Sequence, residues 1–488
     1  MREIKLKVNR YSGKTLMEAL LEEGVQLGGT CGGMGTCGKC KVSVNGQDVL
    51  ACKHKVTEDV IVTVDDGGEN VTVKTVTIQL SEGFSVDQAE EGSYGIAIDL
   101  GTTTVVVMLW NLHTGELVDV EAVSNPQRFY GADVISRISF ALRAPWNLKR
   151  LQSCLVNEVN QAISKLTIRY DIALGQIRKI AVVGNTVMSH LFLGEDVRGL
   201  AAHPFTPAFT GSVKAAAREL GLAAHEEAEV YIGPNMAGHV GSDITAGVLA
   251  WGCLEKGGSR MLLDIGTNGE IFLATEDKTY CCSTAAGPAF EGGALHQGMR
   301  GAEGAISGVS VKDGIVHTDV IGGGPAKGIC GSGIIDALAV MIETGAMDHF
   351  GTMEKPFVLS EEKDDCDAVT VMQADVREVQ MAKAAIAAGC SILLQEGGTT
   401  LEKLEEIGIA GAFGSAIHID RAIRIGLLPK VEISKFRTLG NAAGLGASMM
   451  LLSEPCRKKA EDIAASAKHV ELAALTEFQS RYIEEMNF

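Results

Sequence analysis

Four cysteines near the start of the chain form the first group of residues that could do chemistry. Cys31, Cys37, Cys40 and Cys52 follow the spacing C-x5-C-x2-C-x11-C, and three of them lie in a glycine-rich run over residues 28–40. Four thiolates on one short segment can hold a [2Fe–2S] cluster, and glycines let backbone N–H groups approach the sulfur atoms. Structural zinc is the alternative, but it usually shows two short C-x2–4-C pairs, whereas this segment has one. The spacing therefore favours an iron–sulfur cluster.

A second kind of chemistry is indicated by two copies of Asp-x-Gly-Thr, at residues 99–102 and 264–267, each lying between apolar runs. A turn of this kind offers backbone N–H groups and hydroxyls to phosphate oxygens, and its carboxylate can hold Mg²⁺ through water. One copy is weak evidence because Asp and Gly are common in hairpins. Two copies in matching contexts predict a duplicated lobe, with a nucleotide-binding cleft between the two halves.

Together with a glycine turn over residues 408–415, the two copies form an ordered triplet that resembles the superfamily of actin, sugar kinases and heat-shock chaperones. The resemblance implies binding of ATP and Mg²⁺ by a phosphate-1 motif, a phosphate-2 motif and an adenosine loop. The phosphate-1 motif consists of Asp99, Gly101, Thr102 and Thr103. The phosphate-2 motif consists of Asp264, Gly266, Thr267 and Asn268, and the adenosine loop of Gly411, Ala412, Phe413 and Gly414.

The same resemblance points to Asp243, which precedes Asp264 by 21 residues, as the group that orients the attacking water or hydroxyl. We therefore take Asp243 as the candidate general base, acting with Asp99 and Asp264. A helix N-cap at Asp243 is an equally weighted alternative, and the two roles are compatible. The small-residue run over 283–293 could line the cleft, with Glu291 as a polar contributor.

The elements that must position the cysteines are short. They are a strand over 2–8, a helix over 14–23, strands over 41–44 and up to Cys52 around an Asn-Gly turn at 45–46, and a strand over 60–64. This order resembles the β-grasp domain of plant-type ferredoxins. It departs from that pattern by having five residues, instead of four, between the first two cysteines.

After an acidic stretch, the chain turns to long apolar strands alternating with helices, which predicts an α/β architecture with buried sheets. We expect a ferredoxin-like domain followed by a two-lobed, actin-like ATPase with duplicated ribonuclease H-like lobes. The predicted parts are the [2Fe–2S] domain over 1–78, an acidic linker over 79–92, ATPase lobe I over 93–255 and ATPase lobe II over 256–488, whose C-terminal segment is free to return to lobe I.

The composition excludes several classes of function. With 61 acidic and 43 basic residues the net charge is −18, which argues against nucleic-acid binding. No signal peptide and no membrane-spanning run is visible, so we expect a cytoplasmic protein without membrane contact. The eight cysteines outside the cluster segment have no framework spacing. A redox role for Cys281, Cys282 and Cys330 stays open, although small buried hydrophobes are commoner.

The combination of parts resembles one family, the ATP-dependent reductive activators of corrinoid proteins. Beyond the four cysteines, the resemblance is carried by Asp-Leu-Gly-Thr-Thr, Gly-Asn-Thr, Val-Gly-Ser-Asp-Ile-Thr-Ala, Asp-Ile-Gly-Thr-Asn-Gly-Glu, Ala-Ala-Gly-Pro-Ala-Phe-Glu-Gly, Cys-Gly-Ser-Gly and Gly-Ala-Phe-Gly. It implies that the cluster delivers one electron to Co(II) of a corrinoid protein of a methyltransferase system, regenerating Co(I) at the expense of ATP. It also implies an upstream electron donor and a homodimer.

One departure concerns the spacing between the two parts. The better-known members carry a middle domain, whereas about 15 residues separate the two parts here, or ~50 Å of extended chain at ~3.4 Å per residue. We therefore expect a short member that lacks the middle domain. The alternatives are an iron–sulfur-fused kinase of small molecules and a non-catalytic redox adaptor gated by nucleotide.

Overall fold

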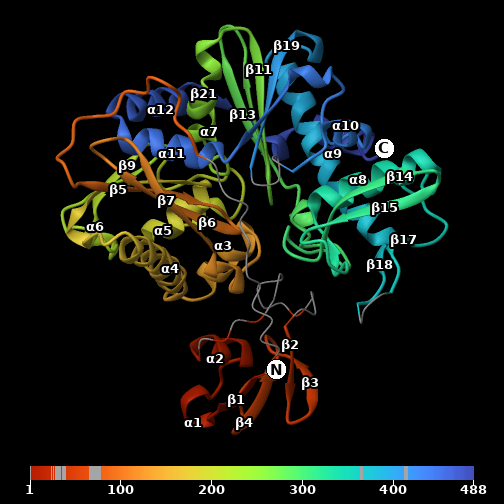
Figure 1. The fold of residues 1–488 in the computed structure, drawn as a ribbon, viewed down its shortest axis with the longest axis horizontal. Helices are drawn as coiled ribbons and strands as arrows, with labels where there is room; N and C mark the ends of the chain where they lie inside the picture. The colour runs from red at the N-terminus through yellow and green to blue at the C-terminus, as the bar shows by residue number, and fades with distance from the viewer. Residues whose placement is uncertain are drawn as a thin grey trace.

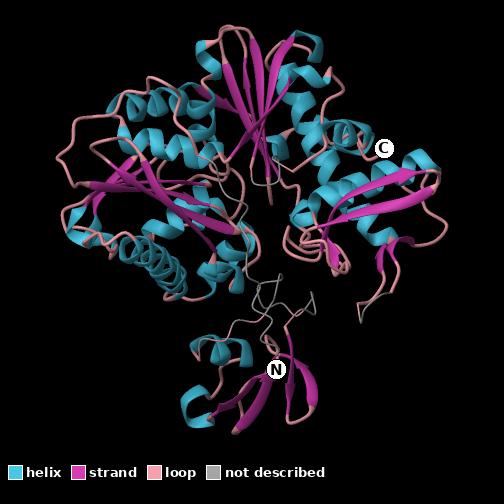
Figure 2. Ribbon diagram, viewed as in Figure 1, coloured by secondary structure: helices cyan, strands magenta, loops and turns pink. Residues whose placement is uncertain are grey.

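The computed structural model describes residues 2–488 except 24, 26, 28–34, 36–39, 65–77, 363–365 and 412–415. Figure 1 shows a small N-terminal domain on one side and two larger lobes on the other. Each larger lobe is built on a six-stranded sheet. In Figure 2, helices accompany both large sheets, as expected of an α/β protein.

The N-terminal domain is a four-stranded sheet in the order β1-β4-β2-β3. The strands are β1 (Arg2–Leu6), β2 (Lys41–Val44), β3 (Gln47–Leu50) and β4 (Val60–Val64), and the helices are α1 (Val8–Tyr11) and α2 (Leu16–Glu22). At the Asn-Gly turn, φ is 50° at Asn45 and 84° at Gly46, as a two-residue turn joining twisted strands requires.

Helix α2 begins where the sequence supplies a capping box. The hydroxyl of Thr15 accepts a bond from the N–H of Glu18 at 3.2 Å, and the Glu18 carboxylate accepts one from the N–H of Thr15 at 2.8 Å. The helix then buries Leu16, Ala19 and Leu20 against the sheet. The expected strand over 2–8 ends earlier, at Leu6, because α1 starts at Val8.

The first large sheet has the order β7-β6-β5-β8-β10-β9. Its strands are β5 (Tyr94–Leu100), β6 (Thr104–Asn111), β7 (Leu117–Ser124), β8 (Ile177–Gly184), β9 (Val213–Ala216) and β10 (Glu229–Ile232). Strand β5 pairs antiparallel with β6 on one side and parallel with β8 on the other. The helices that accompany this sheet are α3 (Val134–Arg143), α4 (Asn147–Arg169), α5 (Thr186–Leu193), α6 (Ala217–Leu220) and α7 (Ser242–Trp251).

The second large sheet has the order β20-β19-β11-β12-β13-β21. Its strands are β11 (Ser259–Ile265), β12 (Gly269–Ala274), β13 (Thr279–Thr284), β19 (Leu404–Ala410), β20 (Phe436–Gly440) and β21 (Ala467–His469). Strand β11 pairs antiparallel with β12 and parallel with β19. Because β11 occupies the place that β5 has in the first sheet, the duplication expected from the two Asp-x-Gly-Thr copies is present, and the expected fold class is confirmed.

The remaining elements belong to the C-terminal part of the chain, and most of them flank the second sheet. They are β14 (Ala305–Lys312), β15 (Ile315–Val320), β16 (Gly328–Ile329), β17 (Phe357–Ser360), β18 (Val369–Val371), α8 (Gly331–Thr344), α9 (Gln373–Glu396), α10 (Ile419–Arg424), α11 (Ala442–Leu452), α12 (Glu454–Ser466) and α13 (Thr476–Glu484). In the described part of the chain, no helix is both long and apolar enough to cross a membrane.

Helices α7 and α11 lie between the two large sheets (Figure 1). One apolar cluster joins Trp110 of the first sheet and Phe272 of the second to Ala246 of α7 and Met450 of α11, all at most 2% exposed. Burial of this continuous apolar surface stabilises the lobes against each other. Helix α11, in the C-terminal segment of the chain, thus contacts lobe I as well as lobe II.

The stretch over 79–92 contains no helix or strand. Part of it is attached to lobe I and α11. The N–H of Asp87 donates to the carbonyl of Leu452 at 2.9 Å, and the Asp87 carboxylate accepts from the N–H of Glu454 at 2.9 Å. Phe84, Val86 and nearby apolar side chains pack on the same cluster as α11. The stretch is therefore fixed at Asp87.

Candidate functional site

The two Asp-x-Gly-Thr copies lie at corresponding places in the two sheets. Asp99 is near the end of β5 and Asp264 near the end of β11, and each is followed by a tight turn into the next antiparallel strand. Gly101, Thr102 and Thr103 form the first turn, and Gly266, Thr267 and Asn268 form the second. The structure thus brings the predicted phosphate-1 and phosphate-2 residues into two matching hairpins.

Behind the first hairpin, two buried side chains hold its backbone carbonyls. The amide of Asn125 donates to the carbonyl of Gly101 at 2.9 Å, and the guanidinium of Arg137 donates to that of Thr102 at 2.5 Å. In a trans peptide the N–H points opposite to the C=O. The N–H groups of Thr102 and Thr103 therefore face away from Asn125 and Arg137, as a phosphate-binding turn requires.

Arg137 is a buried cation beside this hairpin. Burial lowers its pKa to about 10, opposed by nearby acidic groups that include Asp133 and Glu291, so it is charged at neutral pH. Among the described residues, no carboxylate forms an ion pair with it. Its charge therefore favours an anion at the hairpin it supports.

Asp243 lies in the first turn of α7, two residues after the N-cap Gly241. The N-cap alternative for Asp243 is therefore wrong, although the helix does begin there. Its neighbour Ser242 fixes the helix start by bridging the backbone N–H and carbonyl of Gly184, at 3.0 and 3.1 Å. This places Asp243 where it interacts electrostatically with Asp264 and, more weakly, with Asp99.

Burial raises the pKa values of the carboxyl groups around the two hairpins, and the charge of Asp264 raises those of its neighbours further. Burial and the charge of Asp264 raise the pKa of Asp99 to about 7, opposed by a bond from Asn441, and burial raises that of Asp264 to about 6. Burial and Asp264 also raise the pKa of Asp243. Glu270 of β12 is raised by burial and by the charges of Asp243 and Asp264. Such a cluster of acids favours a bound cation.

These residues fit Mg²⁺ held together with a nucleotide. No three described His, Cys, Asp or Glu residues form a closed cage for a metal ion. Mg²⁺ does not need one, because it usually keeps several waters and binds one or two carboxylates plus substrate phosphates. Asp99 and Asp264 supply such carboxylates beside the two turns.

The start of the predicted adenosine loop is next to Asp264. Ala410 of β19 pairs with Asp264 of β11, and Gly411 follows with φ of 91°. A Cβ on Gly411 would lie 2.7 Å from the Oδ1 of Asp264, so this close approach needs glycine. Ala412, Phe413 and Gly414 lie outside the described residues.

In the N-terminal domain, the β2–β3 hairpin places two of the four cysteines together. Cys40 immediately precedes β2 and Cys52 follows β3, and the N–H of Ala51 donates to the carbonyl of Cys40 at 2.9 Å. Both side chains are buried, at 2% and 8% exposure. This donor pair fits two thiolate ligands of a cluster, while Cys31 and Cys37 lie outside the described residues.

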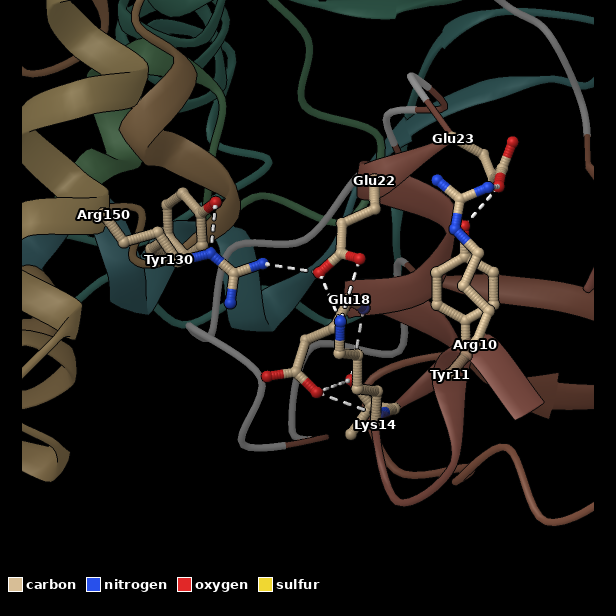
Figure 3. Close-up of polar contacts among 9 residues, drawn as sticks. Arg10, Tyr11, Lys14, Glu18, Glu22, Glu23, Tyr130 and Arg150 are labelled. Carbon is tan, nitrogen blue, oxygen red and sulfur yellow. Dashed lines mark hydrogen bonds and ion pairs between the residues drawn. The ribbon is translucent and has the colours of Figure 1, made fainter. Parts of the chain in front are cut away.

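One contact between the N-terminal domain and lobe I is polar and exposed. Figure 3 shows Arg150 of α4 between Tyr130 and Glu22 of α2. The guanidinium lies 3.7 Å from the Glu22 carboxylate and donates to the Tyr130 hydroxyl at 3.2 Å, while Lys14 also pairs with Glu22 at 2.8 Å. Such exposed pairs contribute ~0–1 kcal/mol each, so this contact alone fixes the cluster domain only weakly.

The cysteines of lobe II are poor redox candidates. Cys281 and Cys282 of β13 are fully buried, which raises the pKa of Cys281 to about 12 and also raises the pKa of Cys282 well above its usual range. A buried thiol with a raised pKa is a weak nucleophile. Cys330, at 6% exposure, is the N-cap residue of α8.

Several residues of the site were not singled out from the sequence. Glu270 belongs to the string Asp-Ile-Gly-Thr-Asn-Gly-Glu. Its role depends on the pairing of β12 with β11, which sets it opposite Asp264 and which the sequence alone does not show. By contrast, Asn185 belongs to the Gly-Asn-Thr string that carries the family resemblance; it caps α5 and lies 3.5 Å from Glu270. Asn441 caps α11 and bonds Asp99, and Arg137 resembled any helix-surface arginine.

Comparison with known proteins finds three matching family descriptions in chain order. They are the 2Fe-2S iron-sulfur cluster binding domain over residues 4–66, the RACo middle region over 94–256, and the C-terminal ASKHA domain of RACo over 259–488. The chain is therefore an ATPase of the ASKHA class fused to a [2Fe–2S] domain.

Individual relatives agree with this class. The corrinoid activation enzyme RamQ of Eubacterium limosum is 36% identical over 425 residues, covering 82% of this chain and 71% of RamQ. A [Co(II) methylated amine-specific corrinoid protein] reductase of Methanosarcina barkeri is 26% identical, covering 81% and 77%. The solved structure of a reductive activator for corrinoid, iron-sulfur protein is 29% identical with a TM-score of 0.77, covering 99% and 96%. The chain belongs to the family of reductive activators of corrinoid proteins.

These findings correct one prediction. The middle domain expected to be missing is present, because the RACo middle region matches residues 94–256, and the solved reductive activator is covered over 96% of its length. The middle region is the lobe that carries Asp99 and Asp243. It was overlooked because its sheet repeats the strand order of the C-terminal domain, so its motifs were assigned to an ATPase lobe.

Proposed function

We propose that this protein uses ATP to drive the transfer of one electron from its [2Fe–2S] cluster to Co(II) of a corrinoid protein, which regenerates Co(I). The observation that carries the proposal is the union, in one chain, of the Cys40–Cys52 hairpin with two facing phosphate hairpins. Relatives that match about four-fifths of this chain are named as a corrinoid activation enzyme and a corrinoid protein reductase. An electron carrier joined to an ATPase suits a reduction that needs energy input.

The energetic requirement follows from the potentials. Plant-type [2Fe–2S] clusters lie near −400 mV, and reduction of Co(II) to Co(I) is uphill for such a donor. Each ~59 mV of deficit costs ~1.4 kcal/mol for one electron. Nucleotide binding lowers this cost if the nucleotide-bound conformation binds the corrinoid protein preferentially in the form whose cobalt is more easily reduced.

Within the nucleotide site we assign roles as follows. Asp99 and Asp264 hold Mg²⁺ through water, and the two turns bind phosphate groups through N–H groups and hydroxyls. Asp243 positions the attacking water, and a nearby cation returns its raised pKa toward the normal range, so that the carboxylate can accept a hydrogen bond from that water. Gly411 lets the adenosine loop approach Asp264.

The remaining parts of the proposal concern partners and surroundings. The corrinoid partner belongs to a methyltransferase system, an upstream donor reduces the cluster, and two chains form a homodimer. The protein works in the cytoplasm, where a [2Fe–2S] domain and unpaired thiols are compatible with reducing conditions.

The test is an anaerobic assay with a Co(II) corrinoid protein, reductant and MgATP, followed by the absorbance of Co(I). We expect reduction to require ATP. Asp264→Ala should abolish ATP hydrolysis while leaving the iron content unchanged. ADP formation that depends on a small-molecule acceptor, without Co(I), would support the kinase instead, and zinc in place of iron would contradict the cluster.

A further inference from the structure

Glu291 lies between the two phosphate hairpins and contacts both. The hydroxyl of Thr103 in lobe I donates to its Oε2 at 2.6 Å, and the hydroxyl of Thr267 in lobe II donates to its Oε1 at 2.7 Å. These two threonines are 164 positions apart in the sequence, and each lies in the turn that follows one Asp-x-Gly unit, Thr103 one position later in its turn than Thr267. One carboxylate therefore joins a threonine hydroxyl of each phosphate hairpin.

The backbone around Glu291 holds this carboxylate in place. Glu291 ends a short 3₁₀ turn over Pro288–Glu291, in which Ala289 and Phe290 are buried at 1% and 2% exposure. The next residue, Gly292, has φ of 74°, and a Cβ there would lie 2.5 Å from the carbonyl of Met299. The turn is thus anchored on both sides of Glu291.

The same segment touches lobe I a second time. The guanidinium of Arg300 donates to the hydroxyl of Ser124, at the end of β7, at 3.2 Å. Residues 291–300 therefore bridge the lobes at two points, Glu291 and Arg300. Of these two contacts, the one at Glu291 involves the hydroxyls of the phosphate hairpins, which could otherwise donate to a bound phosphate.

A hydroxyl has one proton to donate. Thr103 and Thr267 cannot give it to Glu291 and to a phosphate oxygen at the same time, and a carboxylate repels a phosphate in the same space. We propose that Glu291 is a specificity-determining residue of the nucleotide site, whose carboxylate holds both threonine hydroxyls until a nucleotide phosphate between the hairpins takes them over. The inference rests on ATP binding by this chain and does not depend on its corrinoid partner.

The exchange involves only nucleotides with phosphates beyond the first. Arg137, charged and beside the first hairpin, contributes a positive field at the same place, in which a polyphosphate is a stronger competitor than a single carboxylate. AMP does not carry the second and third phosphates. Glu291 therefore weakens the binding of ATP but not of AMP, and so lowers the preference of the site for ATP over AMP.

The test compares the dissociation constants of MgATP and AMP by calorimetry, for the wild type and Glu291→Gln. Hydrogen bonds to a charged acceptor are about twice as strong as neutral ones, so the neutral amide should release the hydroxyls more readily. We expect MgATP to bind about tenfold more tightly, a gain of ~1.4 kcal/mol, and AMP to bind as before. Glu303→Gln, an exposed carboxylate of the following segment, serves as the matched control.

A second variant keeps the test decisive. In a Thr267→Val background one of the two donors is absent, so Glu291→Gln should tighten MgATP binding by a smaller factor, about threefold. Weaker MgATP binding by Glu291→Gln would mean that the carboxylate helps to hold the nucleotide. Unchanged affinity, with or without slower hydrolysis, would mean that Glu291 is not exchanged for phosphate. Each of these results overturns the proposal whatever the outcome with a corrinoid protein.

Discussion

Replacing Asp99 by Asn should stabilise the protein without nucleotide, and the gain should grow with pH. Asp99 is half-buried near the end of β5, faces the charge of Asp264, and receives one stabilising bond from Asn441. Burial and like charge both disfavour its ionised form. Asn has the same shape and carries no charge, so it removes the penalty and retains an oxygen that can accept the bond from Asn441.

The magnitude follows from the pKa of Asp99, which rises from 3.8 to about 7 in the folded protein. Because the folded pKa is the higher one, the folded state binds more protons between these values, and wild-type stability falls as pH rises through that window. At ~1.36 kcal/mol per pH unit the full loss is about 4 kcal/mol. Part of it is already lost at about pH 5, so the advantage of Asp99→Asn should increase by about 2–3 kcal/mol from there to about pH 8.

Scanning calorimetry without Mg²⁺ and nucleotide, at about pH 5 and about pH 8, measures this difference as a change in melting temperature of several degrees. Asp277→Asn, an exposed aspartate on the turn between β12 and β13, is the control and should give the same shift at both pH values. If the advantage of Asp99→Asn were equal at the two pH values, Asp99 would not carry the charge penalty and the argument for a cation-requiring site would fail.

Three further changes test other parts of the molecule. Cys40→Ser should remove most of the iron and the visible absorption while ATP hydrolysis continues, and full iron content would exclude Cys40 as a ligand. Gly411→Ala should cost ~1–2 kcal/mol for its positive φ and also weaken MgATP binding, because its Cβ would lie 2.7 Å from Asp264. Gly398→Ala has positive φ but open space, so it should lower stability only. Asp87→Ala should cost ~1 kcal/mol and raise hydrogen exchange of residues 78–92 about fivefold, and equal exchange would show that this bond does not anchor the stretch.

Sequence reasoning succeeded where local pattern decides structure. The apolar strands around Asp99 and Asp264 share one pattern, and because a hairpin needs only neighbouring residues, the two turns could be placed in advance. The Asn-Gly turn at 45–46 is a similar case, since positive φ at both positions is what these residues permit.

It was incomplete where function depends on contacts between distant residues. Asn441 reaches Asp99 only because α11 crosses from lobe II to lie on the first sheet, and Glu291 meets Thr103 across 188 positions. The wrong prediction that the middle domain is missing has a related cause. The middle region and the C-terminal domain are built on similar sheets with the same motif. The motif alone therefore could not show that the first copy belongs to a middle region.

Helix α11 connects the two halves of the proposed activity. Its N-cap, Asn441, bonds Asp99 at the nucleotide site. At its other end, the carbonyl of Leu452 and the N–H of Glu454 bond Asp87, in the stretch that leads to the cluster domain. A helix of this length is ~16 Å long, so α11 links the hydrogen bond at Asp99 to the hydrogen bonds that fix Asp87.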